Sequence, residues 1–97
     1  MENPSYCLMV NVVMESFEDG ALLLDLKKLS YFEVNATARD VLGMSDGSRT
    51  VQQVAKRLDE EYEIDPQQAL QDVIELYHNL SAKGIVKMIK PAAKKES

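Results

Sequence analysis

Few side chains in this sequence are of a type that could carry out chemistry. Cys7 and His78 are its single cysteine and single histidine, and no motif links them. Alone, they give no metal-ligand spacing and no recognisable pair of nucleophile and base. The acidic run at residues 59–61 places carboxylates at consecutive positions, which diverge around a helix axis and favour a solvated face. Because a glycine-rich phosphate loop is also missing, we predict that the protein is not an enzyme by itself and uses no metal or cofactor.

The composition predicts a single cytoplasmic domain. With 97 residues, 45% of them apolar, the chain can bury one modest core, which we place at residues 1–90, with a lysine-rich tail at residues 91–97. The net charge of −5 repels a phosphate backbone. Acidic Glu2 and the break in the N-terminal apolar run at Asn11 argue against a signal peptide or a membrane span. Since Cys7 can form no internal disulfide, we expect a protein of the reducing cytoplasm that binds neither nucleic acid nor membrane.

The N-terminal half predicts three antiparallel strands. Residues 7–17 form the first strand, and the turn signal at residues 18–20 leads into a second strand at residues 21–26. In the second strand we expect an apolar inner face, with the alternate residues on the other side. The inner face comprises Leu22, Leu24 and Leu26, and the other side comprises Ala21, Leu23 and Asp25. The third strand, residues 30–34, alternates Phe32 and Val34 with Tyr31 and Glu33.

Three helices follow. Asn35 caps a helix over residues 36–44, which a loop at residues 45–48 ends. Thr50 and Gln53 form a capping box for a helix over residues 51–62. Asp65 followed by Pro66 opens a long third helix, and Gly84 ends it before a short extension at residues 85–89. The predicted fold class is α+β, with a three-stranded sheet followed by three helices.

The third strand is a sheet edge, and an exposed edge must be blunted or used. It carries Tyr31 and Phe32, and the third helix is available to pack beside it. An edge strand next to a helix makes a groove to which an extended peptide can add. The alternative is that both aromatic residues simply pack in the core and rim of a small sheet.

Many short motifs occur in a characteristic order and spacing between about Glu15 and Val86. They comprise Leu23, Leu24, Asp25, residues 31–35, Ala38, Asp46, Gly47, Thr50, residues 62–65, Asp72, Val73, Leu80, Gly84 and Ile85. Together they resemble the PqqD-like family, named for the pyrroloquinoline-quinone biosynthesis protein D.

The resemblance implies a winged-helix-like domain that recognises the leader segment of a ribosomally synthesised precursor peptide. Such a domain would act as a peptide chaperone that presents the precursor to a modifying enzyme, such as a radical SAM enzyme or a leader peptidase. The leader is expected to add to the third strand beside the third helix. Position by position, the groove would be formed by Tyr31, Phe32, Glu33 and Val34 of the strand and by Asp72, Leu76, Tyr77 and Lys83 of the helix.

Helical geometry separates these helix candidates. At about 100° per residue, Tyr77 lies at the centre of the apolar face with Val73 and Leu80, where core packing is the simplest interpretation. Leu76 lies at one margin together with Asp72 and Lys83, which suits the rim of a groove. His78 lies at the other margin, so we expect it to be solvated.

Two positions depart from the usual family pattern. Leu42 stands where members commonly carry an aromatic residue, and Leu29 stands where the second hairpin turn often has glycine. The final product therefore stays open: pyrroloquinoline quinone, a lasso peptide, a radical-modified peptide or another modified peptide.

Two other functions stay open. A winged-helix protein that binds DNA is disfavoured, because the third helix carries Asp72 and Glu75 before its first lysine, Lys83. A subunit that uses the same strand edge to self-associate is the other alternative, and we expect a monomer or a weak homodimer.

Overall fold

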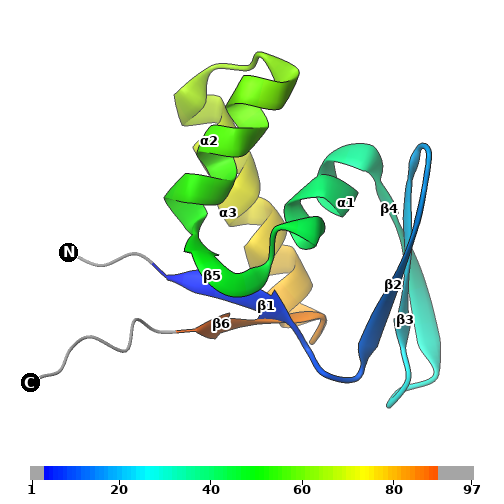
Figure 1. Cartoon of the computed structure of the whole chain (residues 1–97). Helices are drawn as coiled ribbons and strands as arrows, with labels where there is room; N and C mark the ends of the chain where they lie inside the picture. The colour runs from blue at the N-terminus through cyan, green and yellow to red at the C-terminus, as the bar shows by residue number, and fades with distance from the viewer. Residues whose placement is uncertain (1–3, 90–97) are drawn as a thin grey trace, which may run out of the picture.

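The computed structural model describes residues 4–89, which fold into two antiparallel three-stranded sheets and three helices (Figure 1). The strands are β1 (Ser5–Leu8), β2 (Val12–Phe17), β3 (Gly20–Asp25), β4 (Ser30–Asn35), β5 (Asp46–Thr50) and β6 (Val86–Ile89). The helices are α1 (Ala36–Gly43), α2 (Val51–Tyr62) and α3 (Pro66–Ala82). The α+β class and the three helices are confirmed, but the simple order of one sheet followed by three helices is wrong. The predicted tail at residues 91–97 lies outside the described residues.

The predicted meander is the sheet β2-β3-β4, but its first strand is shorter than expected. The predicted strand at residues 7–17 breaks at residues 9–11, where the Val12 amide donates a hydrogen bond to the Met9 carbonyl at 3.0 Å. The segment before the break, β1, pairs instead with β5 and β6 in the second sheet. Ser5 lies opposite Thr50 of β5, and Leu8 lies opposite Val86 of β6. Pairing with β5 and β6, which lie far away in the sequence, thus separates β1 from β2, although residues 7–17 look like one continuous strand.

The second correction concerns which face of β3 points inward. Ala21 and Leu23 are fully buried and Asp25 is 2% exposed, whereas Leu26 is 57% exposed. The predicted inner face, with Leu22 and Leu24, therefore points away from the core. Asp25 can be buried because its Oδ1 accepts hydrogen bonds from Asn11 Nδ2 at 2.8 Å, Lys27 N at 3.0 Å and Lys28 N at 3.1 Å. The number of leucines on each face therefore does not predict which face is buried, because local hydrogen bonds offset the cost of burying the Asp25 carboxylate.

The helices begin and end close to the predicted positions. Thr50 and Gln53 form the expected reciprocal capping box of α2, and Asp65 Oδ2 accepts the amides of Gln67 and Gln68 at the start of α3. Gly84 has a φ of +77°, as the predicted helix stop requires. The predicted loop at residues 45–48 is wrong, because β5 begins at Asp46 and pairs with β1. The short extension after Gly84 is strand β6.

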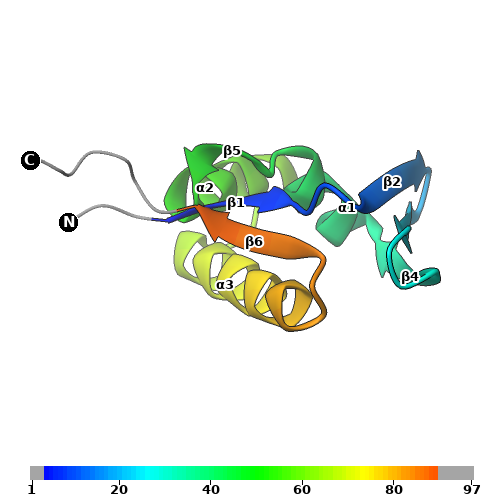
Figure 2. The ribbon, with the colours of Figure 1, turned by 90° about the horizontal axis from the view of Figure 1, so that it is seen from below.

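The core lies between the helices and the β5-β1-β6 sheet. There the Tyr77 ring of α3 stacks on the Tyr6 ring of β1, with ring centroids 4.1 Å apart and an interplanar angle of 13°. The β2-β3-β4 sheet forms a separate layer beyond α1 (Figure 1). Seen from below, β4 lies on the side of the molecule that α3 occupies, and β2 lies on the opposite side (Figure 2).

Candidate functional site

The candidate site is the free edge of β4 beside α3. Within residues 4–89, β4 pairs with β3 on one side and with no other strand. Its outer row of backbone N–H and C=O groups is available for hydrogen bonding. The end of β4 meets α3 across a cleft, and a lysine at the end of α3 lies over an aromatic ring of β4. We call the surface between the β4 edge and α3, which includes this cleft at one end and the lysine at the other, the candidate groove.

The middle of the groove is apolar. Phe32 and Val34 are half-buried on the inner face of β4, and Leu76 is half-buried on α3; all three pack against the hydrophobic core. Tyr31 and Glu33 alternate with them and point to the outer face of the sheet, where Tyr31 is 71% exposed. The predicted alternation of β4 is confirmed, and Leu76 lies at the margin predicted from the helix angle.

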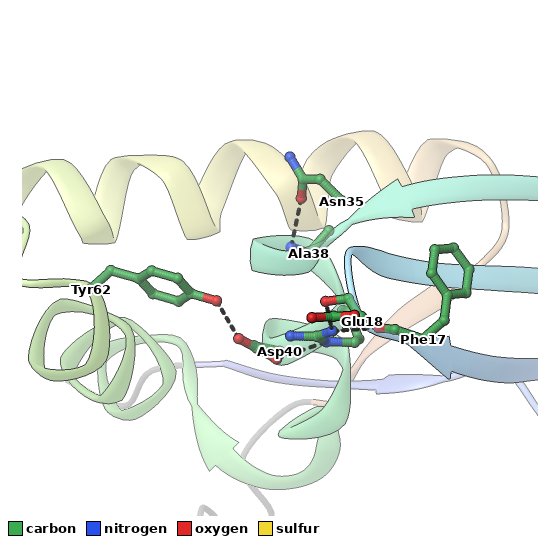
Figure 3. A network of polar contacts seen from close by, with 7 residues as sticks. Phe17, Glu18, Asn35, Ala38, Asp40 and Tyr62 are labelled. Atoms are coloured by element: carbon green, nitrogen blue, oxygen red, sulfur yellow. Dashed lines mark hydrogen bonds and ion pairs between the residues drawn. The ribbon is translucent and has the colours of Figure 1, made fainter.

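At one end the groove opens into a cleft of about 300 Å³. It is lined by Asn35, Thr37, Ala38, Asp72 and Leu76. Asn35 Oδ1 accepts the Ala38 amide at 2.9 Å and so caps α1 (Figure 3). Asp72 Oδ1 accepts a hydrogen bond from Gln68 Nε2 at 2.9 Å, which holds this carboxylate on the exposed side of α3. An acidic group thus marks the α1 end of the groove.

At the other end the groove carries two lysines. Lys83 Nζ lies 5.6 Å from the centroid of the Phe32 ring, within the range of a cation–π interaction. Lys28, in the turn between β3 and β4, donates from Nζ to the Lys83 carbonyl at 3.5 Å. Of the eight predicted site residues, five lie beside the groove: Phe32, Val34, Asp72, Leu76 and Lys83. Tyr31 and Glu33 lie on β4 but face the outer side of the sheet, which corrects the prediction that they form its wall.

The prediction that Tyr77 lines the groove is wrong. The Tyr77 side chain is 1% exposed, stacked on Tyr6, and its hydroxyl lies 2.6 Å from Ser45 Oγ. Burial raises the pKa of Tyr77, although the Ser45 hydrogen bond acts in the opposite direction. A residue at the centre of an amphipathic helix face packs in the core, so Tyr77 does not line the groove.

Sequence reasoning missed the contributions of Lys28, Asn35 and Thr37 to this site. Lys28 reaches α3 because the β3–β4 turn folds toward the end of that helix, which strand periodicity cannot reveal. Asn35 and Thr37 carried a usable signal, since a short polar residue at the junction of an edge strand and a helix must lie at the end of the groove.

A second cleft, of about 400 Å³, lies at the opposite edge of the same sheet, beside β2. It is lined by Met14, Ser16, Arg39, Asp40, Gly43, Met44, Arg57 and Glu61. Arg39 Nη1 donates to the carbonyls of Phe17 and Glu18, Arg39 Nε donates to Asp40 Oδ1, and the Tyr62 hydroxyl donates to Asp40 Oδ2 (Figure 3). These contacts tie the β2–β3 hairpin to α1 and α2. The Arg39 guanidinium and the Asp40 carboxylate of this cleft are therefore already hydrogen-bonded within the protein.

Other kinds of site find little support in the described part of the chain. No three His, Cys, Asp or Glu side chains there gather closely enough to hold a metal ion. No described helix has both the length and the apolar composition needed to cross a membrane.

The sequence profile of a known family matches residues 20–86, more than half of the chain. That family is the coenzyme PQQ synthesis protein D, PqqD. The chain belongs to the PqqD family. The match begins at β3 and ends at the first residue of β6, so it includes both walls of the groove. No curated protein matches this PqqD-family chain significantly.

Solved structures share the fold. A lasso peptide synthetase B1, complexed with the leader peptide, is 24% identical with a TM-score of 0.76, covering 86% of this chain and 98% of its own. TbiB1 in complex with the TbiA(beta) leader peptide is 18% identical with a TM-score of 0.78, covering 88% and 99%. The solution structure of the PqqD part of PqqCD from Methylobacterium extorquens is 26% identical with a TM-score of 0.72, covering 84% and 87%. That PqqD part is described as a functional, stand-alone recognition element for ribosomally synthesised and post-translationally modified peptides.

Proposed function

We propose that this chain binds the leader segment of a ribosomally synthesised precursor peptide and presents the precursor to a peptide-modifying enzyme in the cytoplasm. The observation that carries the proposal is the unpaired edge of β4 beside α3, with an apolar floor between them. Membership of the PqqD family and the likeness to two folds solved with a leader peptide support it. In this proposal α1–α3 and the β2-β3-β4 sheet form a winged-helix-like scaffold, and the chain acts by binding rather than by catalysis.

The mechanism is strand addition. The backbone of an extended leader hydrogen-bonds to the free edge of β4, while its inward side chains enter the apolar groove. Ordering a flexible peptide costs about 1–2 kcal/mol per residue, so backbone hydrogen bonds alone give weak binding. A few buried apolar anchors must supply most of the affinity. On this side of the groove they meet Phe32, Val34 and Leu76.

Matched substitutions test this assignment. Phe32→Ser removes the central ring of the groove, whereas Phe17→Ser removes a 44% exposed ring of β2. We expect Phe32→Ser to weaken binding of the leader about tenfold or more, as at other buried anchors, and Phe17→Ser to leave it nearly unchanged. The measurement is isothermal titration with the leader half of a short precursor peptide encoded beside this chain.

A second set of three substitutions keeps the test valid if Phe32→Ser fails to fold. Leu76→Lys places a charge in the groove, whereas Ile74→Lys and His78→Glu change exposed positions elsewhere on α3. Circular dichroism checks that each variant is folded. Equal affinities for all the folded variants would show that the peptide binds somewhere else.

A further inference from the structure

The wall of the groove on α3 carries opposite charges at its two ends. Asp72 and Lys83 are eleven residues apart, so at about 100° per residue they lie within about 20° of each other around the helix axis. The helical rise of about 1.5 Å per residue separates the two residues by about 16 Å along the axis. Leu76 lies between them and packs against the core. The stripe therefore reads acidic, apolar, basic along the direction of α3.

Two lysines from different parts of the chain place positive charge at the basic end. Lys83 Nζ lies over the Phe32 ring, and Lys28 Nζ reaches the Lys83 carbonyl. Neither lysine belongs to an ion pair within residues 4–89. Both ammonium groups are available to an acidic group on a ligand.

At the acidic end, the negative charge of Asp72 is opposed by the weaker partial positive charge at the start of α1. Asp72 makes a hydrogen bond with Gln68 but no ion pair among the described residues. It faces the start of α1, which carries a partial positive charge of about half an elementary unit. The full charge of the Asp72 carboxylate exceeds that of the helix terminus. A basic side chain is therefore favoured at this end.

We propose that these charges select both the sequence and the direction of the bound leader, an inference that rests on the proposed function. Neighbouring strands of this sheet are all antiparallel, and antiparallel pairing is the more stable kind, so the leader adds antiparallel to β4. It then runs from the Asp72 end to the Lys83 end. At about 3.3 Å per extended residue, 16 Å corresponds to about five residues. Side chains that face the same wall are an even number of residues apart in a strand. The preferred leader therefore has a basic residue, then apolar residues at alternate positions, then an acidic residue about four or six positions downstream.

Peptide selection tests this pattern without knowledge of the natural leader. Random twelve-residue peptides displayed on phage are selected against the full-length protein and against the double variant with Asp72→Lys and Lys83→Glu. Peptides selected by the natural protein should carry the basic residue upstream and the acidic residue downstream. Peptides selected by the double variant should carry them in reverse order. The control is a second double variant, Glu15→Lys with Lys87→Glu, which makes the same charge changes on exposed parts of β2 and β6 and should select the original pattern.

Affinities of the selected peptides, measured as synthetic peptides by fluorescence anisotropy, complete the test. Each single reversal at Asp72 or Lys83 should weaken binding about fivefold, as expected for an exposed ion pair, and exchanging the two charges of the peptide should restore binding to the double variant. Selected peptides that lose binding with Phe32→Ser but show no ordered charges would overturn this inference and leave the proposed function intact. Failure to select any peptide that depends on Phe32 would overturn both.

Discussion

At the scale of single residues, the site depends on side chains that keep β4 in place as well as on those that face the groove. Asp25 is the clearest example, because its buried carboxylate binds Asn11 and two backbone amides of the turn that carries Lys28. These bonds hold the turn against the end of the sheet. A substitution at Asp25 should therefore alter the groove by releasing the turn that carries Lys28.

The Asp25 hydrogen bonds also predict a dependence of stability on pH. The Lys28 amide lowers the pKa of Asp25 below its ordinary value of 3.8, although burial acts in the opposite direction, and Asn11 and Lys27 contribute in the same sense as Lys28. A carboxyl whose pKa is lower in the folded state stabilises the fold above its unfolded value, and this stabilisation is lost as the pH falls through the folded pKa. Native stability should thus fall below about pH 4.

Urea unfolding of the natural protein and of Asp25→Asn, at pH 7 and at pH 3, measures this contribution. The natural protein should be the more stable of the two at pH 7, and the difference should shrink at pH 3. Asp59→Asn makes the same chemical change on α2 and serves as the control. A difference between the natural protein and Asp25→Asn that is equal at both pH values would contradict this role.

At the scale of elements, the turn between β3 and β4 contains a strained residue. Leu29 has a φ of +57° and is 87% exposed, so its side chain gains little from burial while its backbone lies in the left-handed region. For a residue other than glycine this conformation costs about 1–2 kcal/mol. Glycine removes that cost but loses more entropy on folding, about 0.5–1 kcal/mol.

We therefore expect Leu29→Gly to stabilise the protein by about 0.5–1 kcal/mol, which corresponds to a rise in Tm of roughly 2–8 °C for a domain of this size. Thermal unfolding followed by circular dichroism measures it. Lys27→Gly, in the same turn but without a positive φ, should not stabilise the protein. A lower Tm for Leu29→Gly than for the natural protein would mean that the Leu29 side chain makes a stabilising contact.

The elements also explain how much of the fold could be predicted. The starts of α2 and α3 are local events, set by Thr50 with Gln53 and by Asp65 with the following amides, and the sequence alone located both. The break after β1 is not local. It depends on pairing with β5 and β6, about forty and eighty residues along the chain, and no pattern within residues 7–17 contains that information.

In the candidate site, too, local features could be predicted from the sequence and long-range contacts could not. Alternation along β4 and angles around α3 are local, so they correctly predicted that Phe32 and Val34 face inward and that Leu76 lies at the margin of the buried helix face. The contact between Lys28 and the end of α3 depends on how the β3–β4 turn packs, which periodicity does not describe. Which face of β3 is buried was also beyond a pattern of alternating residues, because both faces carry leucine.

At the scale of the whole molecule, the β2-β3-β4 sheet separates the groove from a mixed outer face. That face carries the apolar side chains Val13, Leu22, Leu24 and Tyr31 together with the carboxylates of Glu15 and Glu33. A leader added to β4 would extend this sheet by one strand, and its outward side chains would continue the outer face. Binding of a leader and contact with a larger protein are therefore compatible in space.

The most direct test of leader binding at the β4 edge is an amide NMR titration of the protein with the leader half of a precursor peptide encoded beside it. The account predicts chemical-shift changes concentrated on residues 30–34 and 72–83, with slower hydrogen exchange at those β4 amides that face the free edge. Changes confined to β1, β5 and β6, or no change at saturating peptide concentration, would contradict it.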